Sequence, residues 1–227
     1  MKERVRIKKI YLYEDNCSLR LAQVKDFIEN TFKIPACVKK VKNAVVARGL
    51  VLDFMATRDN ISYTQDKYYI IITNSLFATF SDMDKRIHLR SSLFSYPSII
   101  SLPGIVEAPA KPRGYYLAKQ SLAHTGLWEI EEARIKKELK DRFIDYGDSR
   151  ITEVLKGLVS QALFFYFTGE PFCKIRKCRL YNAHWQEELI HSQIKSGMFC
   201  ARHGRILKKL AGRDNFSISL LVPSQNE

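Results

Sequence analysis

Cysteine and histidine residues near the C-terminus constrain this chain more than any other feature of its sequence. Three of the five cysteines lie close together there, in the order Cys173-x4-Cys178, a longer spacer, and Cys200-x2-His203. Two short chelating pairs joined by a longer spacer are typical of structural zinc sites, because the second pair can come from a separate element. The sequence therefore predicts one structural zinc ion bound by all four residues, with no open coordination position.

The other cysteines and the nearby histidines have simpler interpretations. An odd number of cysteines in a chain expected to be cytoplasmic argues against a disulfide framework. Cys17 and Cys37 are predicted to be small buried hydrophobic residues. His184 and His191 lie two helical turns apart, about 10 Å along a helix axis, which is too far to share one ion. We expect a surface helix at residues 184–191, with Trp185 packed beneath it.

Length and composition describe an ordinary globular protein with a basic surface. The 227 residues suit one large domain, or one domain with a small appendage, and 46% of them are hydrophobic. No apolar run approaches the roughly 18 residues of a membrane span, and the N-terminus lacks the apolar core of a signal peptide. We therefore expect a cytoplasmic protein without a membrane partner. The net charge of +13 keeps nucleic acid open as a partner.

The first half of the chain alternates strand and helix patterns. A helix capped by Ser18 is expected, with an apolar stripe at Leu21, Val24, Phe27 and Ile28, and it should stop at Pro35. Residues 43–54 fit either a helix or a strand with a turn. Alternation and β-branched runs predict strands at residues 7–13, 36–41, 68–73 and 86–94, of which 68–73 should be a buried central strand.

A segment with four prolines, residues 96–113, follows these strands. Proline cannot donate to a β-ladder, so the segment is predicted to hold no central strand, only an edge strand and a long ordered loop. Residue types common in recognition surfaces gather in and beside this loop, although a rigid surface loop explains them equally well. These residues are Glu107, Lys111, Arg113, Tyr115 and Tyr116.

Two contrasting helices come next. Residues 129–142 form a charged pattern that predicts an exposed helix, whereas residues 151–168 carry a nearly ideal apolar stripe and should be buried. Asp148-Ser149 is expected to cap the second helix, and Thr168-Gly169 should end it. A final helix is expected at residues 200–210. The predicted fold class is α/β (α+β): a mixed twisted sheet with one long helix in residues 1–168, then a mostly helical, zinc-stabilised subdomain in residues 169–227.

The cysteine frame resembles that of the archaemetzincins, which are metzincin-type zinc metallopeptidases. Their pattern is HExxHxxGxxHC, then x4-C-x-M and a later C-x-x-C, and its cysteines bind a second, structural zinc. With Cys173 as the first cysteine, Cys178 takes the second position, and Cys200 and His203 take the place of C-x-x-C. Gly169 falls on the glycine and Leu180 on the methionine. Residues 97–101, 106–113 and 181–188 are also similar to an archaeal family of metallopeptidase relatives.

The same resemblance implies that the catalytic residues of the family are replaced here. The three positions for the histidines that bind the catalytic zinc are occupied by Ala162, Tyr166 and Phe172, and Leu163 stands at the position of the general-base glutamate. Activation of a metal-bound water needs nitrogen or oxygen ligands and a nearby carboxylate. We therefore expect a metzincin-like scaffold that keeps a structural zinc and acts by binding, for example a peptide held along an edge strand in residues 86–105.

Two alternatives remain open at this stage, and catalytic activity is undecided. One is a hydrolase whose active site has moved. The other is a basic nucleic-acid-binding protein that uses its C-terminal zinc module. The candidate residues for a relocated active site are His88, Glu107, His124, His184, Glu187 and Glu188, none of which shows catalytic spacing in the sequence.

Overall fold

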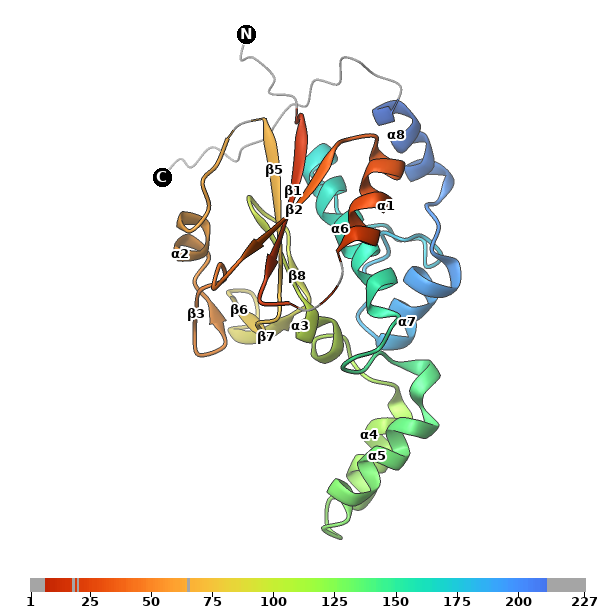
Figure 1. The fold of residues 1–227 in the computed structure, drawn as a ribbon. Helices are drawn as coiled ribbons and strands as arrows, with labels where there is room; N and C mark the ends of the chain where they lie inside the picture. The colour runs from red at the N-terminus through yellow and green to blue at the C-terminus, as the bar shows by residue number, and fades with distance from the viewer. Residues whose placement is uncertain (1–6, 18, 20, 65, 212–227) are drawn as a thin grey trace.

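The computed structural model describes residues 7–17, 19, 21–64 and 66–211. Its main sheet has the strand order β2-β1-β5-β9-β8 (Figure 1). Four of these strands are parallel, and β8 pairs with β9 in the antiparallel direction. The strands are β1 (Lys9–Asp15), β2 (Ala36–Val41), β5 (Lys67–Thr73), β8 (Ser92–Leu93) and β9 (Ser98–Ser101). The mixed α/β prediction is confirmed, and the apolar run of β5 does form the central strand.

A second, smaller sheet packs beside the first, in the order β3-β4-β6-β7. Its strands are β3 (Ala47–Arg48), β4 (Val51–Leu52), β6 (Phe77–Ser81) and β7 (Arg86–Arg90). The ambiguous residues 43–54 thus form two short strands and a turn, followed by helix α2 (Phe54–Asp59). The single strand expected at residues 86–94 is two strands, β7 in this sheet and β8 in the main one.

Two helices cover one face of the main sheet. Helix α1 (Ala22–Phe32) and helix α6 (Ile151–Thr168) pack against each other and against residues such as Ile10 and Ile70 in one hydrophobic core. The expected N-cap residue, Ser18, lies outside the described residues, and Leu21 occupies the N-cap position of α1. The helix ends at Phe32, before Pro35, as the sequence predicted.

The ends of α6 show one cap that the sequence predicted and one that it did not. Arg150 occupies the N-cap, and the Asp148 carboxylate accepts hydrogen bonds from the backbone and guanidinium of Arg150 instead of capping the helix. The predicted stop is confirmed, because Gly169 has φ 75°. That left-handed conformation is inexpensive only for glycine.

The proline-containing segment differs most from its prediction. Strand β9 lies between β5 and β8, so the expected absence of a central strand is wrong, and the expected long loop is instead a short helix followed by a connection at residues 108–112. Helix α3 (Leu102–Glu107) begins with Pro103 in its first turn, and helix α4 (Arg113–Leu122) begins directly after Pro112. Pro97 and Pro112 stand just before an element and Pro103 stands in a first helical turn, where the missing N–H costs no hydrogen bond, and Pro109 lies in the connection between α3 and α4.

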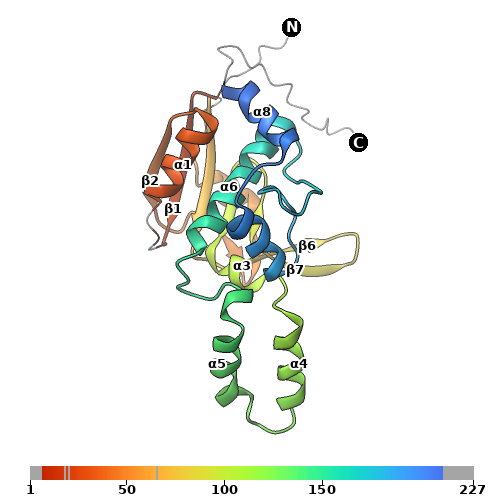
Figure 2. The same ribbon diagram turned by 90° about the vertical axis from the view of Figure 1, so that its right-hand side faces the viewer.

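Helix α4 and helix α5 (Trp128–Glu138) form a hairpin that extends away from the two sheets (Figures 1 and 2). The charged helix expected at residues 129–142 is therefore confirmed as α5 followed by a short 3-10 turn at Lys140–Arg142. The sequence did not predict helix α4, which begins at the last residue of the expected loop.

The C-terminal part is mostly helical, as predicted. It contains helix α7 (Gln186–Ile190), a π-helical turn at His191–Ser196, and helix α8 (Ala201–Ala211). Trp185 is not packed beneath α7; its side chain is 43% exposed, and Gln186, Leu189 and Ile190 are the buried residues. Within the described ranges, the helices are all too short or too polar to cross a membrane.

Candidate metal centre

The fold brings the four predicted zinc ligands to one point. One ligand atom from each of Cys173, Cys178, Cys200 and His203 lies within 4.8 Å of all the others. The Sγ atoms of Cys173 and Cys200 are 3.9 Å apart. Nδ1 of His203 lies 3.1 Å from Sγ of Cys200 and 3.6 Å from Sγ of Cys178. The cluster can therefore hold a metal ion.

A short turn after α6 positions the first pair. The left-handed Gly169 ends the helix, and the backbone N–H of Cys173 then donates to the carbonyl oxygen of Leu180. Between the two cysteines, the N–H of Ile175 donates to Sγ of Cys173, and the N–H of Cys178 donates to the carbonyl oxygen of Ile175. The turn thus holds both thiols on the same side and supplies a hydrogen-bond donor to one of them.

The start of α8 positions the second pair. Cys200 immediately precedes the helix and His203 lies in its first turn, so both side chains face the turn that carries Cys173 and Cys178. The backbone N–H of Cys200 donates to Sγ of Cys178. The His203 ring packs edge-on against Phe164 of α6, with ring centroids 5.2 Å apart. This contact joins the cluster to the hydrophobic core.

The protonation states suit metal ligands. Burial raises the pKa of Cys178 to about 12, which keeps it a thiol until a cation is bound. Burial also opposes ionisation of Cys200, but hydrogen bonds from the His203 backbone and from neighbouring thiols outweigh it and lower the pKa of Cys200. Burial lowers the pKa of His203, so its imidazole is neutral at pH 7. A bound Zn²⁺ ion deprotonates its thiol ligands.

Both the donor set and the spacing fit zinc. Three sulfur atoms and one imidazole nitrogen form one of the common structural zinc sets. With Zn–S bonds of about 2.3 Å, the sulfur atoms of a tetrahedral site lie about 3.8 Å apart. The separation of 3.9 Å between Cys173 and Cys200 matches that value. Cys178 and His203 are buried, and Cys173 and Cys200 are only partly exposed, which protects the site from competing ligands.

By the resemblance to the archaemetzincin pattern, the positions for its catalytic residues lie near the end of α6, at residues 162, 163 and 166, and just after it, at residue 172. Ala162 and Leu163 have no exposed surface, and Tyr166 is 6% exposed. The Tyr166 ring lies 4.7 Å from that of Tyr68, and burial raises its pKa to about 12. Phe172 is 43% exposed and contacts Phe94. These side chains present carbon atoms and one phenol to their surroundings.

Tyr68 of β5 packs against Tyr166 and forms hydrogen bonds through its hydroxyl group. Its hydroxyl lies 2.6 Å from the hydroxyl of Ser98 and donates to the carbonyl oxygen of Ala162. Tyr96 contacts both tyrosine rings, with centroid distances of 5.8 Å to Tyr68 and 5.6 Å to Tyr166. We call Tyr68, Tyr96 and Tyr166 the tyrosine cluster. No sequence pattern predicts this cluster, since its three residues come from distant parts of the chain.

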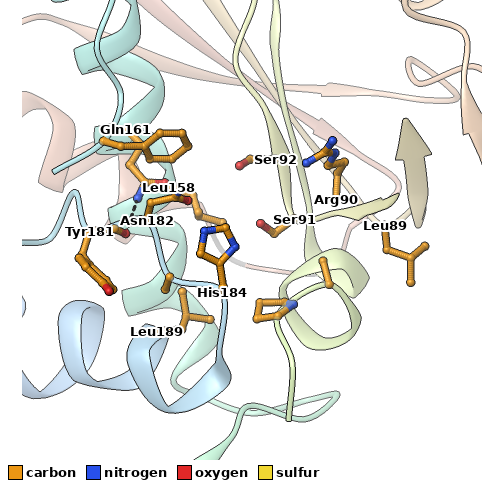
Figure 3. Close-up of a pocket in the computed structure, with 14 residues that line it drawn as sticks. Leu89, Arg90, Ser91, Ser92, Leu158, Gln161, Tyr181, Asn182, His184 and Leu189 are labelled. Atoms are coloured by element: carbon orange, nitrogen blue, oxygen red, sulfur yellow. Dashed lines mark hydrogen bonds between the residues drawn. The ribbon is translucent and has the colours of Figure 1, made fainter. Parts of the chain in front are cut away.

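A pocket of about 160 Å³ opens beside α6, and we call it the α6 pocket. In Figure 3, His184, Asn182 and Gln161 lie on one side of the pocket, and Arg90, Ser91 and Ser92 lie on the other. The imidazole of His184 points across the pocket toward Ser91. Gln161 is held in place because its amide donates to the carbonyl oxygen of Tyr181. Sequence reasoning named only His184 among these residues.

The candidates for a relocated active site are mostly engaged elsewhere. His88 pairs with Asp84, Glu107 pairs with Lys111, and Glu187 pairs with Arg142. The Glu188 carboxylate accepts the backbone N–H groups of His184 and Trp185, which is an N-terminal cap of α7. His124 is exposed near the tip of the α4–α5 hairpin. The structure therefore does not gather these six residues into one site.

The expected recognition loop is also built differently. Tyr115 is buried and donates a hydrogen bond from its hydroxyl to Glu132 of α5, and Tyr116 accepts from the backbone of Lys111. Arg113 begins α4. Most of the named side chains therefore hold the base of the α4–α5 hairpin.

A family model described as a probable metallopeptidase family, DUF6775, matches residues 50–210, a span that includes all four residues of the Cys/His cluster. The chain belongs to this family. Membership agrees with the resemblance to metallopeptidase relatives that the sequence motifs indicated. No curated protein matches the sequence significantly.

Solved structures show which fold this DUF6775 protein adopts. Archaemetzincin from Methanopyrus kandleri is similar with a TM-score of 0.56, at 11% sequence identity, over 94% of this chain and 100% of that one. A zinc-dependent peptidase from Methanocorpusculum labreanum matches with a TM-score of 0.49, at 12% identity, over 87% of this chain and 98% of that one. The first match confirms the predicted archaemetzincin-like fold. Identities this low say nothing further about activity.

Proposed function

We propose that this DUF6775 protein is a non-catalytic, metzincin-like binding protein stabilised by one structural zinc ion. The observation that carries the proposal is the contrast along one stretch of chain. Cys173, Cys178, Cys200 and His203 converge with zinc-like spacing. Ala162 and Tyr166 pack into a hydrophobic core. By the resemblance described above, they stand at two positions where archaemetzincins bind their catalytic zinc.

In this proposal the zinc has a structural role. It would join the turn after α6 to the start of α8, and so hold the described part of the proposed C-terminal subdomain, residues 169–211, against the body of the fold; residues 212–227 of that subdomain lie outside the described residues. Four protein ligands leave no position for a water molecule or a substrate, which is the arrangement of structural and not catalytic zinc. A thiolate-rich site also favours a reducing compartment, so we propose a cytoplasmic location.

The catalytic centre is the part of the fold that we propose is lost. Hydrolysis assisted by zinc needs a metal with an open position and a carboxylate to accept a proton. Leu163 stands at the position where the archaemetzincin pattern has that carboxylate, and it is fully buried. Tyr166 has its pKa raised by burial and its ring packed between other tyrosines. Neither residue can take a proton from water at neutral pH.

The α6 pocket is the proposed binding site for an extended peptide. Strand β8 lies at the edge of the main sheet, and an edge strand can pair with a peptide backbone. Beside it the pocket offers both hydrogen-bond donors and an apolar wall, through residues such as Arg90, His184 and Phe172. Binding of fluorescein-labelled casein peptides should weaken in His184→Ala. It should not change in the control His124→Ala, whose histidine lies on the distant hairpin.

X-ray absorption spectroscopy at the zinc edge tests the metal part of the proposal on protein purified without an affinity tag. The expected spectrum has about three sulfur neighbours near 2.3 Å and one nitrogen neighbour near 2.0 Å. A Cys37→Ser control should leave that spectrum unchanged, because Cys37 lies on β2 outside the cluster. A shell made only of nitrogen and oxygen would contradict the proposal.

A peptidase assay on the same zinc-loaded protein tests the loss of catalysis. We expect the protein to cleave labelled casein no faster than the buffer alone does. Cleavage that disappears in His184→Ala, with zinc content unchanged, would favour the relocated hydrolase instead.

A further inference from the structure

The second face of the main sheet carries a group of aromatic and basic side chains that the proposed function does not use. Helices α1 and α6 cover one face of the sheet, and α2 and β3 lie on the opposite side (Figure 1). Side chains alternate between the faces of a strand. Ile10 and Leu12 point into the core under α1 and α6, whereas Tyr11 and Tyr13 point to the opposite face.

The strand register places tyrosine and lysine side chains next to one another on this face. Tyr11 of β1 pairs with Tyr69 of β5, and Lys9 pairs with Lys67. On the other side of β1, Tyr13 pairs with Lys39 of β2. Three neighbouring strands therefore contribute to one surface. We call it the tyrosine–lysine face, and its members are Lys9, Tyr11, Tyr13, Lys39, Tyr63, Lys67 and Tyr69.

The tyrosine rings of this face form a continuous group. The ring of Tyr69 is buried and is stacked with Tyr11, with centroids 5.6 Å apart and planes 15° from parallel. Tyr13 and Tyr63 contact Tyr69 at 5.7 and 5.4 Å. Tyr63 is 39% exposed, and Tyr11 and Tyr13 are partly exposed. The group thus has a buried base and an accessible upper layer.

Three ammonium groups converge on one ring of this layer. The Nζ atoms of Lys39, Lys9 and Lys67 lie 4.8, 5.5 and 5.6 Å from the centroid of Tyr11. The guanidinium of Arg58 lies over Tyr63 at 5.9 Å. In the described part of the chain, none of the three lysines has a carboxylate oxygen within salt-bridge distance. Like charges held this close repel one another, and an anion between them would relieve that repulsion.

We propose that the tyrosine–lysine face binds single-stranded nucleic acid. Phosphates would lie against Lys9, Lys39 and Lys67, and unpaired bases would contact the accessible tyrosine rings. Basic side chains that track a backbone, combined with aromatic rings that stack on bases, are the two components of sequence-independent single-strand binding. The net charge of +13 adds long-range attraction for a polyanion.

The combination of rings and charges is what selects this ligand. A duplex keeps its bases stacked inside, so it could use the lysines but not the tyrosines. An anionic membrane would attract the lysines and could also take up tyrosine rings at its interface. The tyrosine contribution therefore separates single-stranded nucleic acid from a duplex, and a direct comparison with anionic vesicles separates it from a membrane.

Fluorescence anisotropy tests the proposal with the full-length, zinc-loaded protein and a labelled oligouridylate of about twelve nucleotides, a length within known single-strand site sizes. Lys39→Gln should weaken binding and should reduce the slope of log affinity against log salt by about 0.7. Lys137→Gln is the matched control, because it removes the same charge from an exposed position on α5. It should change neither quantity.

A second pair of variants tests the rings. Tyr63→Ala should weaken oligouridylate binding about fivefold or more, because it removes an aromatic contact with a base. The control Tyr146→Ala removes an exposed tyrosine far along the chain from this face and should have no effect. Circular dichroism and zinc content should be the same in all four variants, since the altered side chains are at the surface.

Three results would overturn the proposal. The first is no binding of oligouridylate at low salt. The second is an equal loss of affinity in the test and control variants. The third is duplex DNA binding as tightly with no loss in Tyr63→Ala, or phosphatidylserine vesicles binding as tightly as oligouridylate, because either result would make the face a general polyanion surface.

Discussion

The Cys/His cluster and the stretch of α6 that precedes it are neighbours in the chain, yet they are stabilised in opposite ways. The cluster gathers three thiols and an imidazole within 4.8 Å, a polar arrangement that is costly to bury unless a cation binds it. Ala162 and Tyr166 are held by carbon contacts and by the hydroxyl of Tyr68. We therefore expect the stability of the cluster to depend on a metal ion and the stability of the neighbouring stretch of α6 not to.

The same contrast bears on the proposed loss of the catalytic metal. Ala162 and Tyr166 belong to the apolar stripe of α6, which packs in the main hydrophobic core, so this part of the fold needs no metal to stay packed. Replacing Cys178 or His203 would leave buried polar groups without partners. We therefore expect the fold to depend on the Cys/His cluster more than on this stretch of α6, and four substitutions or conditions should reveal that difference.

The largest effect is expected from Cys178→Ser, which removes a fully buried ligand. Loss of a structural metal belongs to the mechanisms that cost more than about 4 kcal/mol of unfolding free energy. Chemical denaturation of the variant and the parent protein, both in reducing buffer, measures the loss. Cys37→Ser is the control and should cost less than about 1 kcal/mol. Equal stability of Cys178→Ser and the parent would show that the cluster does not hold a stabilising metal.

Acidification should have the same effect on the cluster without any mutation. Protons compete with zinc for thiolates and imidazole, so zinc affinity falls as the pH falls. The pKa of His203 is lowered by burial, so the unfolded chain binds a proton to this residue at a higher pH than the folded one does. Stability from His203 is thus present above about pH 6.5 and is lost as the pH falls through its lower folded value. A zinc-sensitive dye should report release of zinc below about pH 6, and retention at pH 4 would contradict this.

A smaller effect is expected from Tyr166→Ala in the tyrosine cluster. Truncation of a buried aromatic ring typically costs about 3 kcal/mol, because it leaves a cavity. Zinc content should not change, since Tyr166 is held by Tyr68 and Tyr96 and not by the Cys/His cluster. Loss of a zinc ion from Tyr166→Ala would mean that the phenol is a ligand, and the contrast between the two regions would fail.

The smallest effect is expected from Gly169→Ala, which lies between the two regions. The residue has φ 75°, and a Cβ there would meet no atom within 4 Å. The cost is then only that of a left-handed alanine, about 1 kcal/mol. Thermal unfolding should therefore shift by a few degrees with zinc retained. A loss as large as that of Cys178→Ser would show that the turn geometry, and not the metal, determines the position of Cys173.

The elements that the sequence predicted are those with a strong local signal. The apolar run of β5, the stripe of α6 and its stop at Gly169 depend on nearby residues, and all three are observed. The four residues of the Cys/His cluster were also identifiable, because short spacing within each pair limits where the side chains can reach.

The features that the sequence missed depend on tertiary contacts. Strand β9 is central although Pro97 precedes it, because the proline stands outside the ladder that Ser98–Ser101 forms with β5. Gly104 lies where a Cβ would collide with the carbonyl oxygen of Arg90, a close approach visible only in the folded chain. The α6 pocket combines Arg90, Gln161 and His184 from three separate segments. Spacing along the chain cannot predict such a grouping.

Counting zinc ions per chain by plasma mass spectrometry tests the proposal of a single structural zinc most directly. The protein should be purified without a metal-affinity tag. We predict one zinc per chain in the parent protein and none in the Cys178→Ser, Cys200→Ser double variant. Two zinc ions per chain would reveal a second metal site and contradict the proposed loss of the catalytic centre. A folded parent protein that contains no zinc would contradict the structural role of the Cys/His cluster.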